Sequence, residues 1–148
     1  MEQAKKQLKI SSIFVLLYAG LSLLNIITEL LFGEINSTPL PAGSPENILQ
    51  ITKIILLVVS LVILLPKFYV GMKGLGIAKN PNSSKKHITW AMLILVFEAI
   101  GFIDPVLGIL KQGNIADNFG ALAGAALEVI IIYEYIKYAK HVAKLAEK

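Results

Sequence analysis

Two glutamates, Glu98 and Glu128, lie near the middle of long apolar stretches of the sequence. In a helix that rises about 1.5 Å per residue, each would lie roughly 15 Å from the nearest polar boundary, at His87 or Asn118. An ionised carboxylate at this depth in a lipid bilayer costs about 3 kcal/mol or more. Each side chain must therefore face other protein groups, hold a proton or bind a cation.

Two carboxylates that lie close together share a proton and titrate as a pair, as a proton-coupled transporter or a cation-binding protein requires. Glu98 and Glu128 are therefore candidate proton or ligand sites. Tyr18 is a third candidate, because it lies at a similar depth in the first apolar stretch. The structural alternative is that both carboxyl groups are protonated and form hydrogen bonds between helices, with the Tyr18 hydroxyl as their partner.

Four other charged residues favour structural ion pairs. Lys67 and Glu134 both fall toward the same end of their apolar stretches, where a salt bridge between them would remove two uncompensated charges. Nearer the opposite end, Glu29 and Lys53 are placed to pair between the first and second stretches. The alternative for Lys67 is that its long side chain extends the ammonium group to the lipid headgroups.

Small residues at one end of the last apolar stretch predict a close helix contact. Gly120 and Gly124 are separated by three residues in an apolar segment, the GxxxG spacing that lets two membrane helices approach closely. We expect this face to pack within the molecule against the first or third span. The alternative is that the same face forms a homodimer.

Several kinds of chemistry are excluded by the residues present. The chain has no cysteine, which excludes thiolate ligands, cysteine nucleophiles and disulfide exchange. It has no zinc-protease, serine-hydrolase or nucleotide-binding loop motif. His87 and His141 lie at the polar ends of apolar stretches, where neither is placed to bind a haem iron. We therefore expect no cofactor, no metal site and no enzymatic activity.

The elements that must position these side chains are apolar helices. Hydrophobic residues make up 55% of the 148 residues, charged residues only 16%, and the mean hydropathy is +0.69. Charged residues make up about 25% of soluble domains, so this composition predicts an all-α integral membrane protein. We expect one domain, 1–148, that forms an antiparallel four-helix transmembrane bundle with spans at about 10–32, 48–72, 88–110 and 118–138. Gly101 and Pro105 predict a bend in the third span.

The positions of the lysines predict the orientation of the bundle. All 14 basic residues are lysine. Eleven of them lie at the N-terminus, in the central loop or at the C-terminus: Lys5, Lys6, Lys9, Lys73, Lys79, Lys85, Lys86, Lys137, Lys140, Lys144 and Lys148. Because positively charged loops stay in the cytoplasm, we expect a cytoplasmic loop at about 73–87 and cytoplasmic N- and C-termini.

The amino-acid composition also indicates the location of the protein and its partners. The absence of arginine and the abundance of isoleucine are typical of an AT-rich bacterial genome. We therefore expect a multi-pass protein of the bacterial cytoplasmic membrane, in contact with the lipid bilayer. The formal net charge of +4 follows from membrane topology and anionic headgroups, so no nucleic-acid partner is expected.

The functional hypothesis is a small non-enzymatic membrane protein that acts as a scaffold, partner-binding or regulatory subunit, as a homo-oligomer or with another membrane protein. The alternative is a small proton- or cation-coupled transporter, or a protein that binds an amphipathic ligand, through Glu98 and Glu128. A continuous polar cavity at these carboxylates would favour transport. A closed bundle with an open groove at Gly120 and Gly124 would favour a partner role. The sequence by itself assigns no family.

Overall fold

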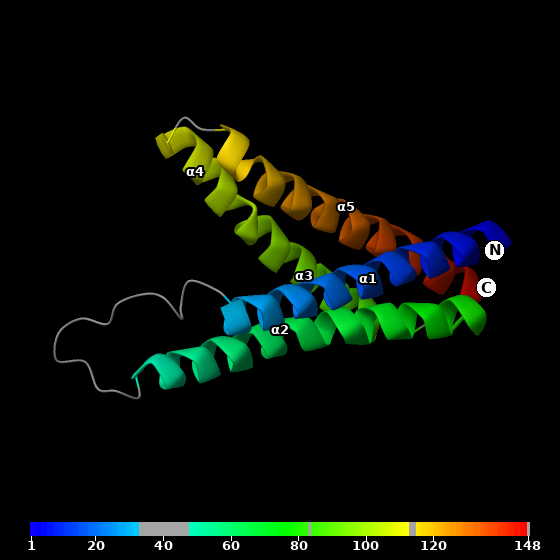
Figure 1. Ribbon diagram of the computed structural model, residues 1–148. Coiled ribbons are helices and arrows are strands. Elements are labelled where there is room, and N and C mark those ends of the chain that lie inside the picture. Colours follow the sequence, from blue (N-terminus) through cyan, green and yellow to red (C-terminus); the bar gives the residue numbers. More distant parts are fainter. Residues whose placement is uncertain (33–47, 83, 113–114, 148) are drawn as a thin grey trace.

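The computed structural model describes residues 1–32, 48–82, 84–112 and 115–147. Within these ranges the regular elements are five α-helices: α1 (Glu2–Phe32), α2 (Ile48–Lys79), α3 (Lys86–Gly101), α4 (Ile103–Gln112) and α5 (Ile115–Ala146). The helices α3 and α4 follow one another along one broken rod, so the chain forms four rods in all (Figure 1). The predicted all-helical, four-helix architecture is therefore confirmed.

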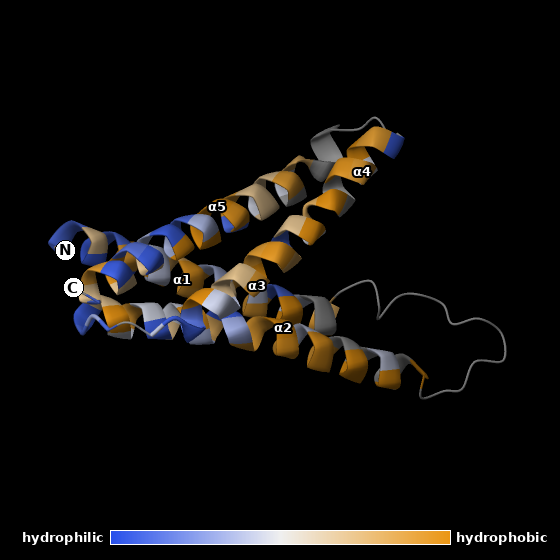
Figure 2. Ribbon diagram, turned by 180° about the vertical axis from the view of Figure 1, so that it is seen from behind, coloured by the Kyte–Doolittle hydropathy of each residue, from blue (hydrophilic) through white to orange (hydrophobic). Residues whose placement is uncertain are grey.

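Three of the helical stretches are long and apolar enough to cross a membrane: Glu2–Thr28, Leu57–Lys79 and Lys86–Lys111. Large apolar side chains point outward from them, such as those of Leu21, Val62 and Phe97. Apolar colour covers much of the helices away from the chain termini (Figure 2). Apolar side chains on such a surface are stable in contact with lipid tails, whereas in water they would promote aggregation. The fold is that of a multi-pass membrane protein.

The four rods form two hairpins that meet at one end. The first consists of α1 and α2, and the second consists of α3, α4 and α5. Around the bundle, α1 packs against α2 and α5, and α3 packs against the same two helices. Both chain termini lie at the end where the hairpins come together, and the hairpins diverge toward the opposite end (Figures 1 and 2).

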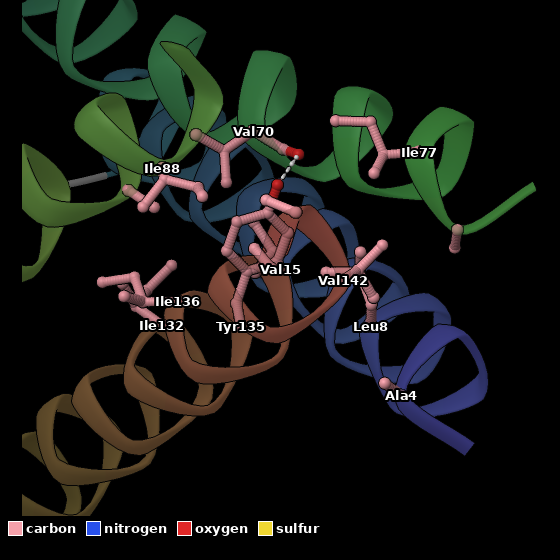
Figure 3. Packing of buried hydrophobic residues seen from close by; sticks show 14 of the residues in the cluster. Ala4, Leu8, Val15, Val70, Ile77, Ile88, Ile132, Tyr135, Ile136 and Val142 are labelled. Atoms are coloured by element: carbon pink, nitrogen blue, oxygen red, sulfur yellow. Dashed lines mark hydrogen bonds between the residues drawn. The ribbon is translucent and has the colours of Figure 1, made fainter. Parts of the chain in front are cut away.

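The buried core lies at the end that holds the termini (Figure 3). Its largest fully buried side chain is Tyr135 of α5, whose hydroxyl donates a hydrogen bond of 2.9 Å to the backbone carbonyl of Val70 in α2. Leu8 and Val15 of α1 and Val142 of α5 belong to the same cluster. The Val70 carbonyl thus accepts a hydrogen bond from α5 although it lies inside the helix α2. This contact holds α5 against α2.

Two buried glycines of α2 let the rods approach closely. A Cβ atom at Gly74 would lie 2.5 Å from Cε2 of Tyr135 and would also collide with the Ser12 side chain. A Cβ atom at Gly71 would lie 2.6 Å from Cγ of Leu16 in α1. Both distances are shorter than real Cβ atoms tolerate, so α1 and Tyr135 occupy the space that a side chain would need.

These contacts correct the expected position of the loop between the second and third spans. Gly74 and Gly76 fall within the loop expected at about 73–87, but α2 continues through both to Lys79, and α3 begins at Lys86. Residues 73–79 are therefore helical, and the connection is much shorter than 73–87. Gly74 lies in a close contact with neighbouring helices, not in a turn.

The other boundaries follow the prediction more closely. The bend in the third span occurs where it was expected, because α3 ends at Gly101 and α4 begins at Ile103. The helices α1 and α5 extend beyond the apolar spans at the end that holds the termini. Pro66 lies inside α2 and does not end it.

Candidate ion-binding site

The ammonium group of Lys67 lies between the carboxylates of Glu98 and Glu128. Its Nζ atom is 2.7 Å from Oε1 of Glu98 and donates a hydrogen bond to Oε1 of Glu128. The three residues come from α2, α3 and α5, so one cation joins three helices. We call this group the ion cluster.

All three side chains of the ion cluster are largely buried. Their exposed fractions are 8% for Lys67, 16% for Glu98 and 14% for Glu128. Lys67 lies twelve residues before the end of α2, and Glu98 lies twelve residues after the start of α3. At about 1.5 Å per residue, both are roughly 18 Å from the connection between these antiparallel helices. The geometry therefore brings them to the same level.

The ion cluster lies at the limit of the buried core. Among the described residues, the last buried apolar side chain on each helix, counted away from the termini, is Ala19 of α1, Leu64 of α2, Ile94 of α3 and Ile132 of α5. Beyond this level, toward the diverging ends of the hairpins, the apolar side chains of these helices are exposed or half-buried. The ion cluster thus closes the packed part of the bundle.

The charges of the ion cluster do not balance when all three groups are ionised. One ammonium and two carboxylates carry a net charge of −1. Among the described side chains, Lys67 is the basic residue that contacts Glu98 or Glu128. An uncompensated charge is costly in a bilayer, so neutrality requires one proton on a carboxyl group or one further cation. The arrangement can therefore hold a single exchangeable proton.

The structure brings together the two carboxylates that the sequence singled out, but not with the expected partner. Tyr18 is half-buried on α1, and no hydrogen bond between described residues involves its hydroxyl. Because α1 packs against α2 and α5 and not against α3, Tyr18 does not join the contacts that bridge Glu98 and Glu128.

The expected ion pair between Lys67 and Glu134 is wrong. Glu134 pairs instead with Lys137 of the same helix, where the Nζ–Oε1 distance is 3.1 Å. With the second span expected to end at about residue 72, Lys67 would lie near the end of its helix, at the same level as Glu134. Because α2 continues to Lys79, Lys67 lies deeper and reaches the two mid-membrane carboxylates.

Two further predictions concern an ion pair and a close helix contact. The side chains of Glu29 and Lys53 lie outside the described part of the structure. At Gly120 and Gly124, no described atom comes within 4 Å of an added Cβ. The predicted packing of these two glycines against another span of the same molecule is therefore not observed.

Sequence reasoning missed an apolar groove beside the ion cluster. Its volume is about 170 Å³, and it lies between α2 and α3. Pro66, Lys67, Trp90, Phe97 and Glu98 contribute to its walls, together with aliphatic side chains of both helices. One signal was present in the sequence, since Trp90 and Phe97 are seven residues apart and lie on one helical face.

His87 lies at the start of α3, the polar end of its apolar stretch, but it is buried within the protein. It is only 1% exposed and lies edge-on to the Tyr135 ring, with 6.0 Å between the ring centroids. Neither ring nitrogen has a hydrogen-bond partner among the described residues. In the same ranges, no group of three His, Cys, Asp or Glu side chains is arranged to hold a metal ion.

Comparison with known proteins adds no further constraint. No protein-family model, no curated protein and no solved structure matches this chain. The functional argument therefore depends on the residues and geometry described above.

The central role of Lys67 predicts a large effect of its removal. Lys67→Met leaves two buried carboxylates without a counter-charge, and breaking a buried ion pair in this way costs about 3–5 kcal/mol. We expect a clearly lower thermal unfolding temperature in detergent. Lys79→Met, at the exposed end of α2, is the matched control and should change little.

A neutral version of the ion cluster should recover much of that stability. The triple variant Lys67→Met, Glu98→Gln, Glu128→Gln removes all three charges, so no uncompensated charge stays buried. If Lys67→Met alone unfolds at the same temperature as Lys79→Met, the ion cluster does not hold these helices together.

Proposed function

We propose that this protein binds and releases a proton at the ion cluster, as a small proton- or cation-coupled transporter or binding protein. The observation that carries this proposal is the contact of one ammonium group, that of Lys67, with two buried carboxylates. A purely structural bridge is neutral with one carboxylate per ammonium. The second carboxylate adds a charge that only a proton or another cation can compensate.

The position of the ion cluster supports exchange. Its side chains are largely buried but not sealed, with 16% of the Glu98 side chain exposed. Glu98 also borders the groove between α2 and α3. The walls of this groove are mainly apolar, which favours an amphipathic ligand over a hydrated ion. Proton exchange coupled to such a ligand is non-enzymatic.

We further propose that α5 forms the fourth span and that both termini are cytoplasmic, in the inner membrane of a bacterium. Supporting this, the end of the bundle that holds the termini carries most of the lysines. Positively charged segments are retained on the cytoplasmic side.

This orientation predicts the labelling of a single introduced cysteine. Asn82 is exposed in the connection between α2 and α3, and the chain has no cysteine of its own. In intact cells, Asn82→Cys should be protected from a membrane-impermeant thiol reagent and should react after the cells are opened. Equal labelling before and after opening would place this connection outside the cytoplasm.

Proton exchange is tested by comparing Glu98→Gln and Glu128→Gln with the wild-type protein. Each substitution leaves one ammonium and one carboxylate, a pair that is neutral without a bound proton. We expect the wild-type protein to release about one proton per chain on titration, and each variant to lack this step. Proton release from purified protein in a weakly buffered solution measures it.

Glu134→Gln is the matched control, because Glu134 is a partly exposed glutamate of the same helix and pairs with Lys137. It should retain the proton step of the ion cluster. Identical titration of the wild-type protein, Glu98→Gln and Glu128→Gln would contradict the proposal and leave the ion cluster a structural contact.

A second candidate function is that of a scaffold, partner-binding or regulatory subunit. It is supported by the open space at Gly120 and Gly124, which no described atom fills. This GxxxG pair lies on α5 toward the end where the hairpins diverge (Figure 1). A helix of a second copy or of another membrane protein could approach this face closely.

Bulky side chains at this face should prevent such an association. We expect Gly120→Leu combined with Gly124→Leu to shift the protein from a larger assembly to a monomer, measured by light scattering in mild detergent. Gly76→Leu is the control, because Gly76 also has open space around it but lies on α2. A wild-type chain that is monomeric and co-purifies with no other membrane protein would contradict this function.

A further inference from the structure

The groove beside the ion cluster faces outward between α2 and α3. Several of its wall residues are widely exposed: Val62 is 62% exposed, Trp90 is 44% exposed and Phe97 is 56% exposed. Because α2 and α3 belong to stretches that are apolar enough to cross a membrane, the mouth of the groove opens to the lipid. A ligand can therefore enter from within the bilayer.

The walls of the groove combine two features that recognise cations. Trp90 and Phe97 present aromatic rings, whose faces attract an ammonium group. Glu98 borders the same groove, whose surface is otherwise almost entirely apolar, and its carboxylate lies directly behind this wall, in contact with Lys67. Lys67 also borders the groove, but its ammonium group is occupied by the two carboxylates of the ion cluster. The charge that a ligand meets here is the net −1 of the deprotonated ion cluster.

We propose that this groove binds the headgroup of an amphipathic organic cation, which takes the place of the proton held by the ion cluster. This inference rests on the proposed proton exchange and names its ligand class. When the cation occupies the groove beside Glu98, the proton leaves to solvent and the total charge of the site does not change. The aliphatic side chains of α2 and α3, such as Val62 and Leu93, provide a surface for the apolar tail.

The size and charge of the groove narrow the choice of ligand. At about 170 Å³, it is smaller than the roughly 300 Å³ or more of typical drug-binding pockets. It therefore takes a headgroup such as trimethylammonium, while the tail lies along the helices in the lipid. A zwitterionic lipid headgroup carries no net charge, so it cannot compensate the charge that the departing proton leaves behind.

The chain provides its own probe for this site, since Trp90 is its single tryptophan. Tryptophan fluorescence of the full-length protein in maltoside micelles can be followed during addition of dodecyltrimethylammonium. We expect a saturable change in fluorescence together with the release of about one proton per chain. Dodecylphosphocholine has the same tail and the same ammonium group but no net charge, and dodecyl sulfate is anionic. Neither should release the proton or saturate the signal.

Two substitutions test the walls of the groove separately. Phe97→Leu keeps an apolar side chain but removes an aromatic ring, and we expect binding of the cation to weaken about 3- to 10-fold. Glu98→Gln removes the carboxylate and should abolish saturable binding. The controls are Phe14→Leu, an exposed phenylalanine of α1, and Glu134→Gln, both outside the groove. Both should bind as the wild-type protein does.

The possible results separate this inference from the proposed function. Equal responses to the cationic, zwitterionic and anionic detergents, or unchanged binding by Glu98→Gln and Phe97→Leu, would overturn the groove as a cation site. A proton step without saturable cation binding would also overturn it while leaving the proposed proton exchange intact. Saturable cation binding without proton release would contradict both the replacement of the proton and the proposed proton exchange, and would leave the groove as a cation site alone.

Discussion

The contact of the Lys67 ammonium with two carboxylates is the interaction on which the arrangement of the bundle depends. Inside a membrane, apolar packing alone does not select one helix partner, because lipid tails are as apolar as leucine. Specific positions therefore come from close backbone contacts and from polar pairing. Gly71 and Gly74 bring α1 toward α2, and Tyr135 ties α5 to α2. The ion cluster adds α3 to this group and ends the packed region.

The same interaction links the fold to its chemistry through a charge that does not balance. A lysine with a single glutamate would hold two helices without further consequence. With Glu98 and Glu128 both in contact, neutrality in the bilayer requires a proton or another cation. In the proposed mechanism, the groove gives an amphipathic cation access to the ion cluster from the lipid, so that one site holds either species. On this account, stability and exchange depend on the same three side chains.

Composition and hydropathy were enough to predict the membrane class, the helices and the bend after Gly101, because each depends on local sequence. The depth of Glu98 and Glu128 followed from the helical rise. The partners of Lys67 could not be predicted in this way, because they depend on how far α2 extends and on the rotation of each helix about its own axis. Gly74 misled the prediction because the same residue type marks a helix end or a close helix contact. The neighbouring Ser12 and Tyr135 side chains distinguish the two cases.

Infrared spectroscopy of the protein in lipid bilayers at neutral pH tests the central claim most directly. The carbonyl stretch of a protonated carboxylic acid is separated from that of a carboxylate, so the measurement counts protonated side chains. The account predicts one protonated carboxyl group per chain, absent from both Glu98→Gln and Glu128→Gln and retained by Glu134→Gln. A wild-type spectrum without a protonated carboxyl group, or one whose band survives both substitutions, would contradict the claim that the ion cluster holds a proton.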